Sequence, residues 1–272
     1  MLRDPGGQTV ALRFDPAETS AKDRAFLAIS EQGGYVKVLL PIRPNGTVGW
    51  IRSSDVVLEP AAFRVVIDLQ AHALTVEENG KVLLRQQVAT GTGSNPTPQG
   101  LFYIVDRLPQ ANPGGGLGPF AFKLSGFSET LYSFAGGQGA IGLHGTNAPG
   151  QLGANVSHGC IRIDNASIAR LAATLPIGTP VEIVRTLADR PAGTAAGTAF
   201  PPRPLTTVPT SPSPSSAGSS PVPLPAAAPA PTTAAPGAAS DGPKGPAVKR
   251  VRRATPAAGA TPPAAGGESK GD

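Results

Sequence analysis

The sequence predicts a mainly β protein in which one β domain with a single packing helix is preceded by a small β module and followed by a disordered tail. Three observations support this fold class. Short apolar runs separated by Gly- and Pro-containing turns extend through residues 1–186. Only one stretch, after Asp164, carries apolar residues at helical spacing. From residue 187 the chain is largely Pro, Ala, Gly, Ser and Thr, and holds 18 of the 31 prolines.

Residues 1–60 are predicted to form the small β module. Tyr35–Leu40 is a largely apolar run, and the turn Pro44-Asn45-Gly46 precedes a strand with the only tryptophan, Trp50, as a core residue. This segment resembles a bacterial SH3-like module, in which a Gly-Trp-Ile/Val strand near the end is typical. The first strand of such a module would begin almost at Met1. We therefore expect the given start to lie inside a longer protein.

Residues 62–186 are predicted to form the main β domain. The turn Glu78-Asn79-Gly80 joins two of its strands by a type I′ hairpin. Asp164 is the expected N-cap of the helix, whose inner face carries Ile168, Leu171, Ala172 and Leu175. The expected strands are Phe63–Leu69, Ala73–Val76, Val82–Val88, Leu101–Val105, Ala140–His144 and the closing Gly178–Val184.

Residues 187–272 are predicted to be disordered, because their composition cannot bury enough apolar surface to offset the entropy of ordering. They hold eight Lys or Arg and four Asp or Glu, which accounts for most of the net charge of +5. The basic cluster Lys249–Arg253 is either a solvated run or a weak electrostatic contact for anionic wall or membrane polymers. No aromatic platform or nucleic-acid-binding fold accompanies it, so nucleic acid is not expected as a partner.

The start of the sequence shows no signal peptide, because Met1–Pro5 is followed by no apolar segment. No apolar run is long enough to span a bilayer. Taken literally, these features indicate a cytoplasmic protein.

The chemistry centres on the only cysteine, Cys160. A thiol acts as a nucleophile once a base or a cation favours its thiolate. Two of the three histidines lie close to it in sequence, His158 and His144. Gly159 permits close backbone approach, so the N–H groups of Gly159 and Cys160 are candidates for an oxyanion pocket.

Other roles for the same residues remain open at this point. A lone cysteine is often a small buried core residue, and Cys160, His144 and His158 are zinc-ligand types, although His-Gly-Cys is a tight spacing for two ligands. The glycines at 114–116 precede no helix and no Lys-Ser/Thr, which excludes a P-loop. A papain-like order would place the base downstream of the nucleophile, whereas His144 precedes Cys160. We expect neither a metal nor another cofactor.

Two motifs in order resemble the signature of the L,D-transpeptidase (YkuD-type) catalytic domain. They are Ile141-Gly142-Leu143-His144-Gly145-Thr146 and Ser157-His158-Gly159-Cys160-Ile161-Arg162-Ile163. The turn Thr97–Gly100 and the final strand support the resemblance, which covers residues 62–186. It implies a β-sandwich or barrel domain of that family.

The resemblance also implies roles for individual residues. Cys160 matches the nucleophile, and His144 matches the general base, oriented by the backbone carbonyl of Gly145. His158 and Gly159 match positions that shape the oxyanion pocket, with Ser157 supporting them. Arg162 matches a position that contacts a substrate carboxylate or stabilises the loop by a structural ion pair. Residues 111–118 and 120–133 fall where the family carries a lid over the cleft.

The implied activity is acyl transfer on peptidoglycan stem peptides, through a thioester at Cys160, to an acceptor amine that yields a 3→3 cross-link. With water as acceptor the same site is an L,D-carboxypeptidase, and with a protein lysine it anchors proteins. A non-catalytic wall-binding protein is the alternative from another class. Because the substrate lies outside the membrane, we expect an extracytoplasmic location and a misassigned start. The sequence leaves the oligomeric state open.

Overall fold

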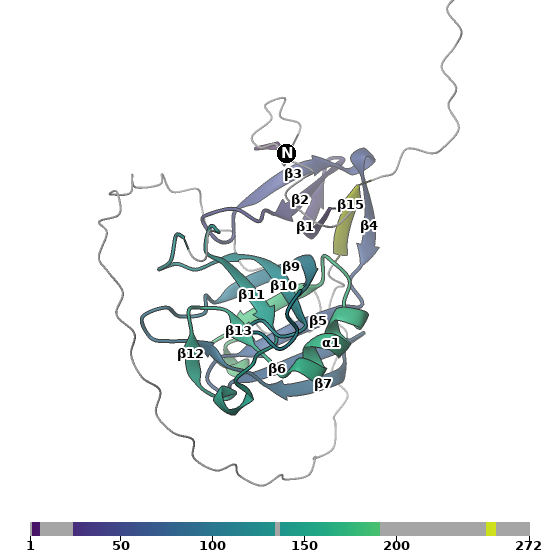
Figure 1. The fold of residues 1–272 in the computed structure, drawn as a ribbon. Coiled ribbons are helices and arrows are strands. Elements are labelled where there is room, and N and C mark those ends of the chain that lie inside the picture. Colours follow the sequence, from purple (N-terminus) through teal and green to yellow (C-terminus); the bar gives the residue numbers. More distant parts are fainter. Residues whose placement is uncertain (1, 6–23, 134–136, 191–248, 254–272) are drawn as a thin grey trace, which may run out of the picture.

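The computed structural model describes residues 2–5, 24–133, 137–190 and 249–253, and consists of two β-sheets, a short strand pair and a helix (Figure 1). The prediction of a mainly β protein is confirmed. Within the described residues the only α-helix is α1 (Asn165–Thr174). No helix of this part of the chain is long and apolar enough to cross a membrane.

The larger sheet has the strand order β13-β11-β10-β9-β14-β5-β6-β7. Its strands, in chain order, are β5 (Phe63–Asp68), β6 (Ala73–Glu78), β7 (Lys81–Gln87), β9 (Gly100–Pro109), β10 (Phe120–Phe127), β11 (Ala140–His144), β13 (Ile161–Arg162) and β14 (Pro180–Val184). Two short strands, β8 (Thr90–Gly91) and β12 (Asn155–Ser157), pair in parallel beside it. Single turns of 3₁₀ helix cover Ser53–Asp55, Pro149–Gln151 and Leu187–Asp189.

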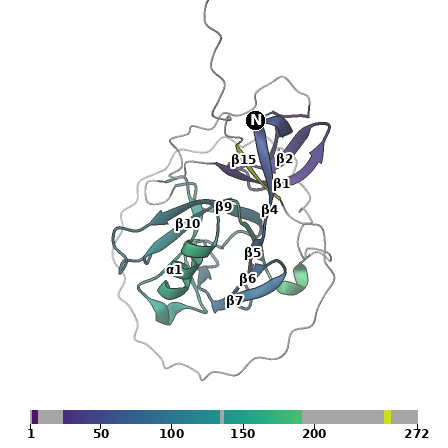
Figure 2. The ribbon, with the colours of Figure 1, turned by 90° about the vertical axis from the view of Figure 1, so that its right-hand side faces the viewer.

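Local sequence signals set several of these elements. Asn79 and Gly80 both have positive φ (49° and 80°), as a type I′ turn between β6 and β7 requires. The side chain of Asp164 accepts a hydrogen bond from Ser167 N at 2.8 Å and so caps α1, as predicted. The helix α1 packs on β10 (Figure 2). Ile168 and Leu171 of α1 are buried.

One expectation about the larger domain is wrong. The resemblance predicts a lid over residues 120–133, but Phe120–Phe127 is β10, which lies between β9 and β11 inside the sheet. All residues from Leu124 to Phe127 are buried, as expected for a strand whose two faces both contact other parts of the protein.

The smaller sheet has the order β3-β2-β1-β15-β4 and comes mostly from the N-terminal module. Trp50 is buried in it, as predicted. The resemblance of this module to an SH3-like fold stays a prediction. The strands are β1 (Ala25–Gln32), β2 (Tyr35–Leu39), β3 (Val48–Arg52), β4 (Val56–Pro60) and β15 (Lys249–Arg253).

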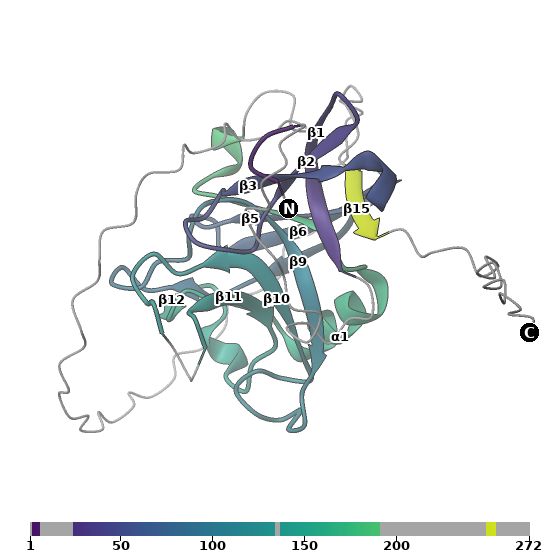
Figure 3. The same cartoon turned by 90° about the horizontal axis from the view of Figure 1, so that it is seen from above.

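The strand β15 differs from the expectation of disorder for residues 187–272. It lies between β1 and β4 and pairs antiparallel with both (Figure 3). Val251 is fully buried, while Lys249 and Arg250 form ion pairs with Glu31 and Glu59. These contacts explain how a basic segment becomes ordered there. The remainder of the predicted tail, apart from 187–190, lies outside the described residues.

The strand β9 contributes side chains to the hydrophobic cores of both sheets. Phe102 and Ile104 point into the core of the larger sheet, whereas Tyr103 and Val105 pack with residues of the module such as Leu27. Alternate side chains of a strand face opposite sides, so β9 is buried on both. The module therefore rests directly on the larger domain.

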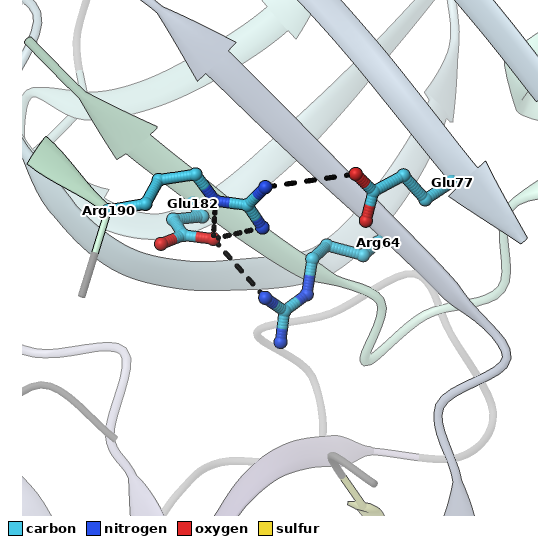
Figure 4. A network of polar contacts seen from close by, with 4 residues as sticks. All are labelled: Arg64, Glu77, Glu182 and Arg190. Atoms are coloured by element: carbon cyan, nitrogen blue, oxygen red, sulfur yellow. Dashed lines mark hydrogen bonds and ion pairs between the residues drawn. The ribbon is translucent and has the colours of Figure 1, made fainter. Parts of the chain in front are cut away.

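A buried ionic network holds the end of the larger domain on its sheet (Figure 4). The carboxylate of Glu182 on β14 accepts from Arg64 on β5 at 3.3 Å and from Arg190 at 3.0 Å. Arg190 also lies 3.8 Å from Glu77 on β6. The segment after β14 is thus tied to three adjacent strands.

Candidate active site

Strand pairing brings Cys160 beside the strand that carries His144. β13 runs parallel to β11 with Leu143 opposite Ile161 and His144 opposite Arg162. Gly159, which precedes the cysteine, has φ +113°. Because side-chain-bearing L residues rarely adopt that conformation, only glycine fits there without strain. Cys160 therefore enters β13 at the level of Gly142.

The side chains of Cys160 and His144 converge over Gly142. The N–H of Gly142 donates to Sγ of Cys160 at 3.4 Å. A Cβ atom placed on Gly142 would lie 3.8 Å from Cδ2 of His144 and 3.9 Å from Sγ of Cys160. The imidazole edge and the thiol thus face the same point, which a side chain at position 142 would occupy.

His144 is buried, with 5% of its surface exposed, and its ring is fixed by a hydrogen bond between Nδ1 and the carbonyl oxygen of Gly145 at 2.6 Å. A carbonyl oxygen only accepts, so Nδ1 carries the proton. Nε2, which is bonded to Cδ2, is then the acceptor nitrogen. The predicted orientation of His144 by Gly145 matches this geometry.

Burial keeps both groups uncharged. It raises the pKa of Cys160 above its usual value, against the hydrogen bond from Gly142 and the positive charge of Arg162, which lower it. Burial also lowers the pKa of His144, and Arg162 adds to that effect, while the hydrogen bond to Gly145 opposes it. The resting pair is therefore a thiol and a neutral imidazole.

Ser157 and Thr97 hold the backbone on either side of Gly159. Ser157 Oγ donates to the carbonyl oxygen of Cys160 at 2.5 Å and accepts from Gly159 N at 3.0 Å. Thr97 Oγ1 donates to the carbonyl oxygen of Gly159 at 3.0 Å. The Gly159 N–H is thus engaged by Ser157. This differs from the expectation that it points at a developing oxyanion.

Arg162 and His158 lie beside this centre in different environments. The guanidinium of Arg162 donates to Oε1 of Gln151 at 3.2 Å, and its buried Nε has no hydrogen-bond partner among the described residues. The positive charge of Arg162 acts to lower the pKa of both Cys160 and His144. The side chain of His158 is exposed.

Three residues of the site carried no assigned role in the sequence analysis. Gly142 lies in the first motif, and its small size was the available signal. Thr97 lies in the turn Thr97–Gly100, and its hydroxyl group was the available signal. Asn165 gave none, because its role is tertiary: Oδ1 accepts from Thr146 N at 2.8 Å and so fixes the turn after His144. In the described part of the chain, no three His, Cys, Asp or Glu side chains gather as a metal site requires.

Comparison with known proteins gives consistent matches. Residues 62–183 match the family model of the YkuD L,D-transpeptidase catalytic domain. A Bacillus licheniformis protein named as a candidate L,D-transpeptidase, YkuD, is 30% identical over 154 residues, which are 54% of this chain and 85% of that protein. The Bacillus subtilis protein of the same name is 36% identical over 123 residues. Those residues are 45% of this chain and 66% of the relative, so the match spans slightly less than two thirds of its length.

Among solved structures, an L,D-transpeptidase from Mycobacterium smegmatis aligns with a TM-score of 0.37 at 22% identity. The alignment covers 55% of this chain and 66% of that one.

Proposed function

Because the chain belongs to the L,D-transpeptidase family, we propose that it is a cysteine acyltransferase that forms a thioester at Cys160 with peptidoglycan stem peptides. The observation that carries this proposal is the convergence of Cys160 and His144 over Gly142. The fixed Nδ1–H tautomer supports it further, because it leaves Nε2 as the basic nitrogen, next to the Cδ2 atom that faces the space over Gly142.

Acylation begins when Sγ of Cys160 attacks the carbonyl carbon of the third residue in a donor tetrapeptide stem. Nε2 of His144 takes the thiol proton as the S–C bond forms, since the thiol is protonated at rest. The tetrahedral oxyanion then collapses and the C–N bond to D-alanine breaks. The imidazolium gives its proton to the leaving amine, and a thioester remains on Cys160.

Transfer to the acceptor reverses these roles. An acceptor amine attacks the thioester carbonyl, His144 removes its proton, and the S–C bond breaks. The proton returns to Cys160, which regenerates the thiol. With the side-chain amine of a second stem as acceptor, the product is a 3→3 cross-link. With water the product is a shortened stem, and with a protein lysine it is a wall-anchored protein.

Four neighbouring residues have supporting roles in this proposal. Ser157 and Gly159 set the backbone path into Cys160 through the hydrogen bonds that they share. Arg162 supplies positive charge next to the centre and is the candidate contact for a substrate carboxylate. His158, which is exposed, is the candidate contact at the rim. Enzymes of this family act on the cell wall, so we propose an extracytoplasmic location for this chain.

The proposal is tested by incubating the full chain with a disaccharide-tetrapeptide and following protein and products by mass spectrometry. We expect an acyl adduct on Cys160 and release of D-alanine, both absent in Cys160→Ala. His144→Ala should slow acylation by about 10²–10⁴-fold, the usual contribution of a general base. His72→Ala, a histidine outside the site, serves as the control and should acylate at the wild-type rate.

The products also separate the remaining alternatives. Linked stems, a tripeptide or a protein conjugate identify the acceptor as a stem amine, water or a lysine. D-alanine release that persists in Cys160→Ala would refute the proposed mechanism. A non-catalytic wall-binding protein would show neither adduct nor release, and its wall association would be unchanged in Cys160→Ala.

A further inference from the structure

We propose that the N-terminal module is a positioning part of the active site, and that Arg43 is the residue through which it acts. Arg43 lies in the turn between β2 and β3 and reaches the connection between β10 and β11, 85 positions away in sequence. The described parts of that connection, residues 128–133 and 137–139, are called the β10–β11 flanks.

The guanidinium of Arg43 binds three backbone carbonyls from both β10–β11 flanks. Nη1 donates to Ser128 O at 2.6 Å, and Nη2 donates to Leu131 O at 2.9 Å and to Gln138 O at 3.0 Å. A planar guanidinium can serve several acceptors in fixed directions, which a lysine ammonium does less well. One side chain of the module therefore holds together the two ends of this connection.

Aromatic and amide contacts reinforce the same junction. The guanidinium carbon of Arg43 lies 5.0 Å from the ring centre of Phe127 and 4.6 Å from that of Tyr132, within cation–π range. The neighbouring Asn45 donates to Phe127 O at 2.8 Å and accepts from Phe127 N at 2.9 Å. The end of β10 is thus bound by two residues of the same turn of the module.

The two flanks are in close backbone contact at Gly139 and Leu131. Gly139 has φ +67°, and a Cβ atom placed on it would collide with Leu131 O and lie 3.1 Å from the Arg43 guanidinium. Ser128 N also donates to Gly139 O at 2.8 Å. This packing sets where Ala140 begins β11, which two residues later supplies the Gly142 N–H to Cys160.

A second route leads from the flanks to the residue before the nucleophile. Thr130 Oγ1 donates to Asn95 Oδ1 at 3.1 Å. Two residues after Asn95, Thr97 Oγ1 donates to the carbonyl oxygen of Gly159 at 3.0 Å. Both sides of the Cys160 centre are therefore linked to Arg43 by short chains of contacts. The effect on acyl transfer rests on the proposed function, whereas the anchoring of the flanks does not.

The test uses the full chain with Arg43→Ala, Arg43→Lys and Asn45→Ala. Arg52→Ala is the matched control, because Arg52 is an exposed arginine of the same module. Amide exchange at Ser128 and Leu131 should accelerate about tenfold or more in Arg43→Ala, as expected when local anchoring is lost, while Ile67 in the sheet core is unchanged. Arg43→Lys and Asn45→Ala should show smaller accelerations at the same amides, and Arg52→Ala none.

Function is read from acylation by the disaccharide-tetrapeptide and from alkylation of Cys160 by iodoacetamide. Acylation efficiency should fall about tenfold in Arg43→Ala, because small displacements of reacting groups cost that much, while alkylation by the small reagent stays within about twofold. Partial recovery in Arg43→Lys would separate positioning from a loss of folding.

Two results would overturn the proposal. One is unchanged exchange at Ser128 and Leu131 in Arg43→Ala. The other is faster exchange with acylation at the wild-type rate. If the wild-type chain forms no thioester, the proposed function fails, and positioning is then judged from the reaction of Cys160 with a bulky maleimide. A rate change of about threefold or more in Arg43→Ala, but not in Arg52→Ala, supports positioning, and equal rates refute it.

Discussion

At the scale of single residues, the protonation states of Cys160 and His144 decide how the site can start a reaction. Burial holds the thiol protonated and the imidazole neutral, and the neighbouring Arg162 opposes a charged imidazole. A preformed thiolate–imidazolium pair is therefore disfavoured at rest. Proton transfer to His144 has to accompany attack on the substrate.

This resting state predicts a definite pH dependence for acylation. The neutral form of His144 is the active base, so activity is lost as the pH falls through its pKa. Because burial lowers that pKa, the acid limb of acylation efficiency should lie below pH 6.5, the ordinary value. Because burial raises the pKa of Cys160, its alkylation by iodoacetamide should still increase with pH at pH 9.0.

The profile is measured as acylation efficiency against pH with the disaccharide-tetrapeptide. An acid limb above pH 6.5, together with alkylation that levels off near neutral pH, would indicate an ion pair at rest. That outcome would contradict the uncharged pair.

Gly142 gives a second prediction at this scale. In Gly142→Ala the new methyl group would touch Cδ2 of His144 at 3.8 Å and Sγ of Cys160 at 3.9 Å, and it would lie 3.3 Å from Phe122 O, so the strand would have to shift slightly. We expect acylation to fall about 10–100-fold, because the methyl group would occupy the space onto which both reacting groups face and would keep the substrate carbonyl from its reactive position. Gly150→Ala is the control, because nothing lies within 4 Å of a Cβ there. Equal rates for both variants would show that the space over Gly142 is not part of the reaction.

At the scale of elements, β15 is the strand that departs most from the sequence-based expectation, because it was expected to be disordered. It lies between β1 and β4, and its central residue Val251 is fully buried beside Phe26 and Leu27. Without it, β1 and β4 would each have an unpaired edge. The basic segment therefore completes the module, and two of its charges are paired rather than left for an anionic polymer.

Val251→Asp tests this element. A carboxylate in that core has no hydrogen-bond partner, so we expect a loss of about 2–4 kcal/mol in the free energy of unfolding and release of β15. Amide exchange at Leu27 and Leu58, which face β15 across the sheet, should accelerate. Lys249→Ala removes only an ion pair that is about half exposed and should cost less than about 1 kcal/mol. Equal exchange in both variants would argue against a stable β15.

At the scale of the whole molecule, residues of the larger domain complete the hydrophobic core of the module. Tyr103 and Val105 of β9 are buried against the module, and the hydroxyl of Tyr103 donates to Leu39 O at 3.4 Å. A Cβ on Gly178, between α1 and β14, would lie 3.0 Å from Cβ of Ala25. The larger domain expressed alone would expose this surface, so the full chain is the right material for every measurement of acylation.

The shared core predicts that both parts unfold together. The only tryptophan, Trp50, reports on the module, and the only cysteine, Cys160, reports on the larger domain. Urea unfolding followed by tryptophan fluorescence and by thiol reactivity should give coincident transitions. The Arg43 contacts add to this coupling. Two separated transitions would mean that the interface contributes little to stability.

Much of the larger domain was predictable because its signals are local. The apolar run within Phe63–Asp68, the Asn79-Gly80 turn and the Asp164 cap each depend on neighbours within a few residues. The spacing of the His144 and Cys160 motifs likewise marked the site. The strand β10 also carries a local signal, because Phe120, Phe122 and Leu124 alternate with smaller or polar residues, but the resemblance assigned this segment to a lid.

By itself, the sequence determined the mainly β class, the one α-helix of the described residues, and the identity of the residues at the candidate site. Those properties follow from short-range preferences and from a chemistry that needs particular side chains. Only the tertiary structure brought the thiol and the imidazole together over Gly142 and engaged the Gly159 N–H with Ser157. It also brought Arg43 to the β10–β11 flanks and set β15 beside β1. The Lys249–Glu31 pair is separated by 218 positions, and such pairing depends on the closure of long loops and on a shared core, for which no local pattern codes.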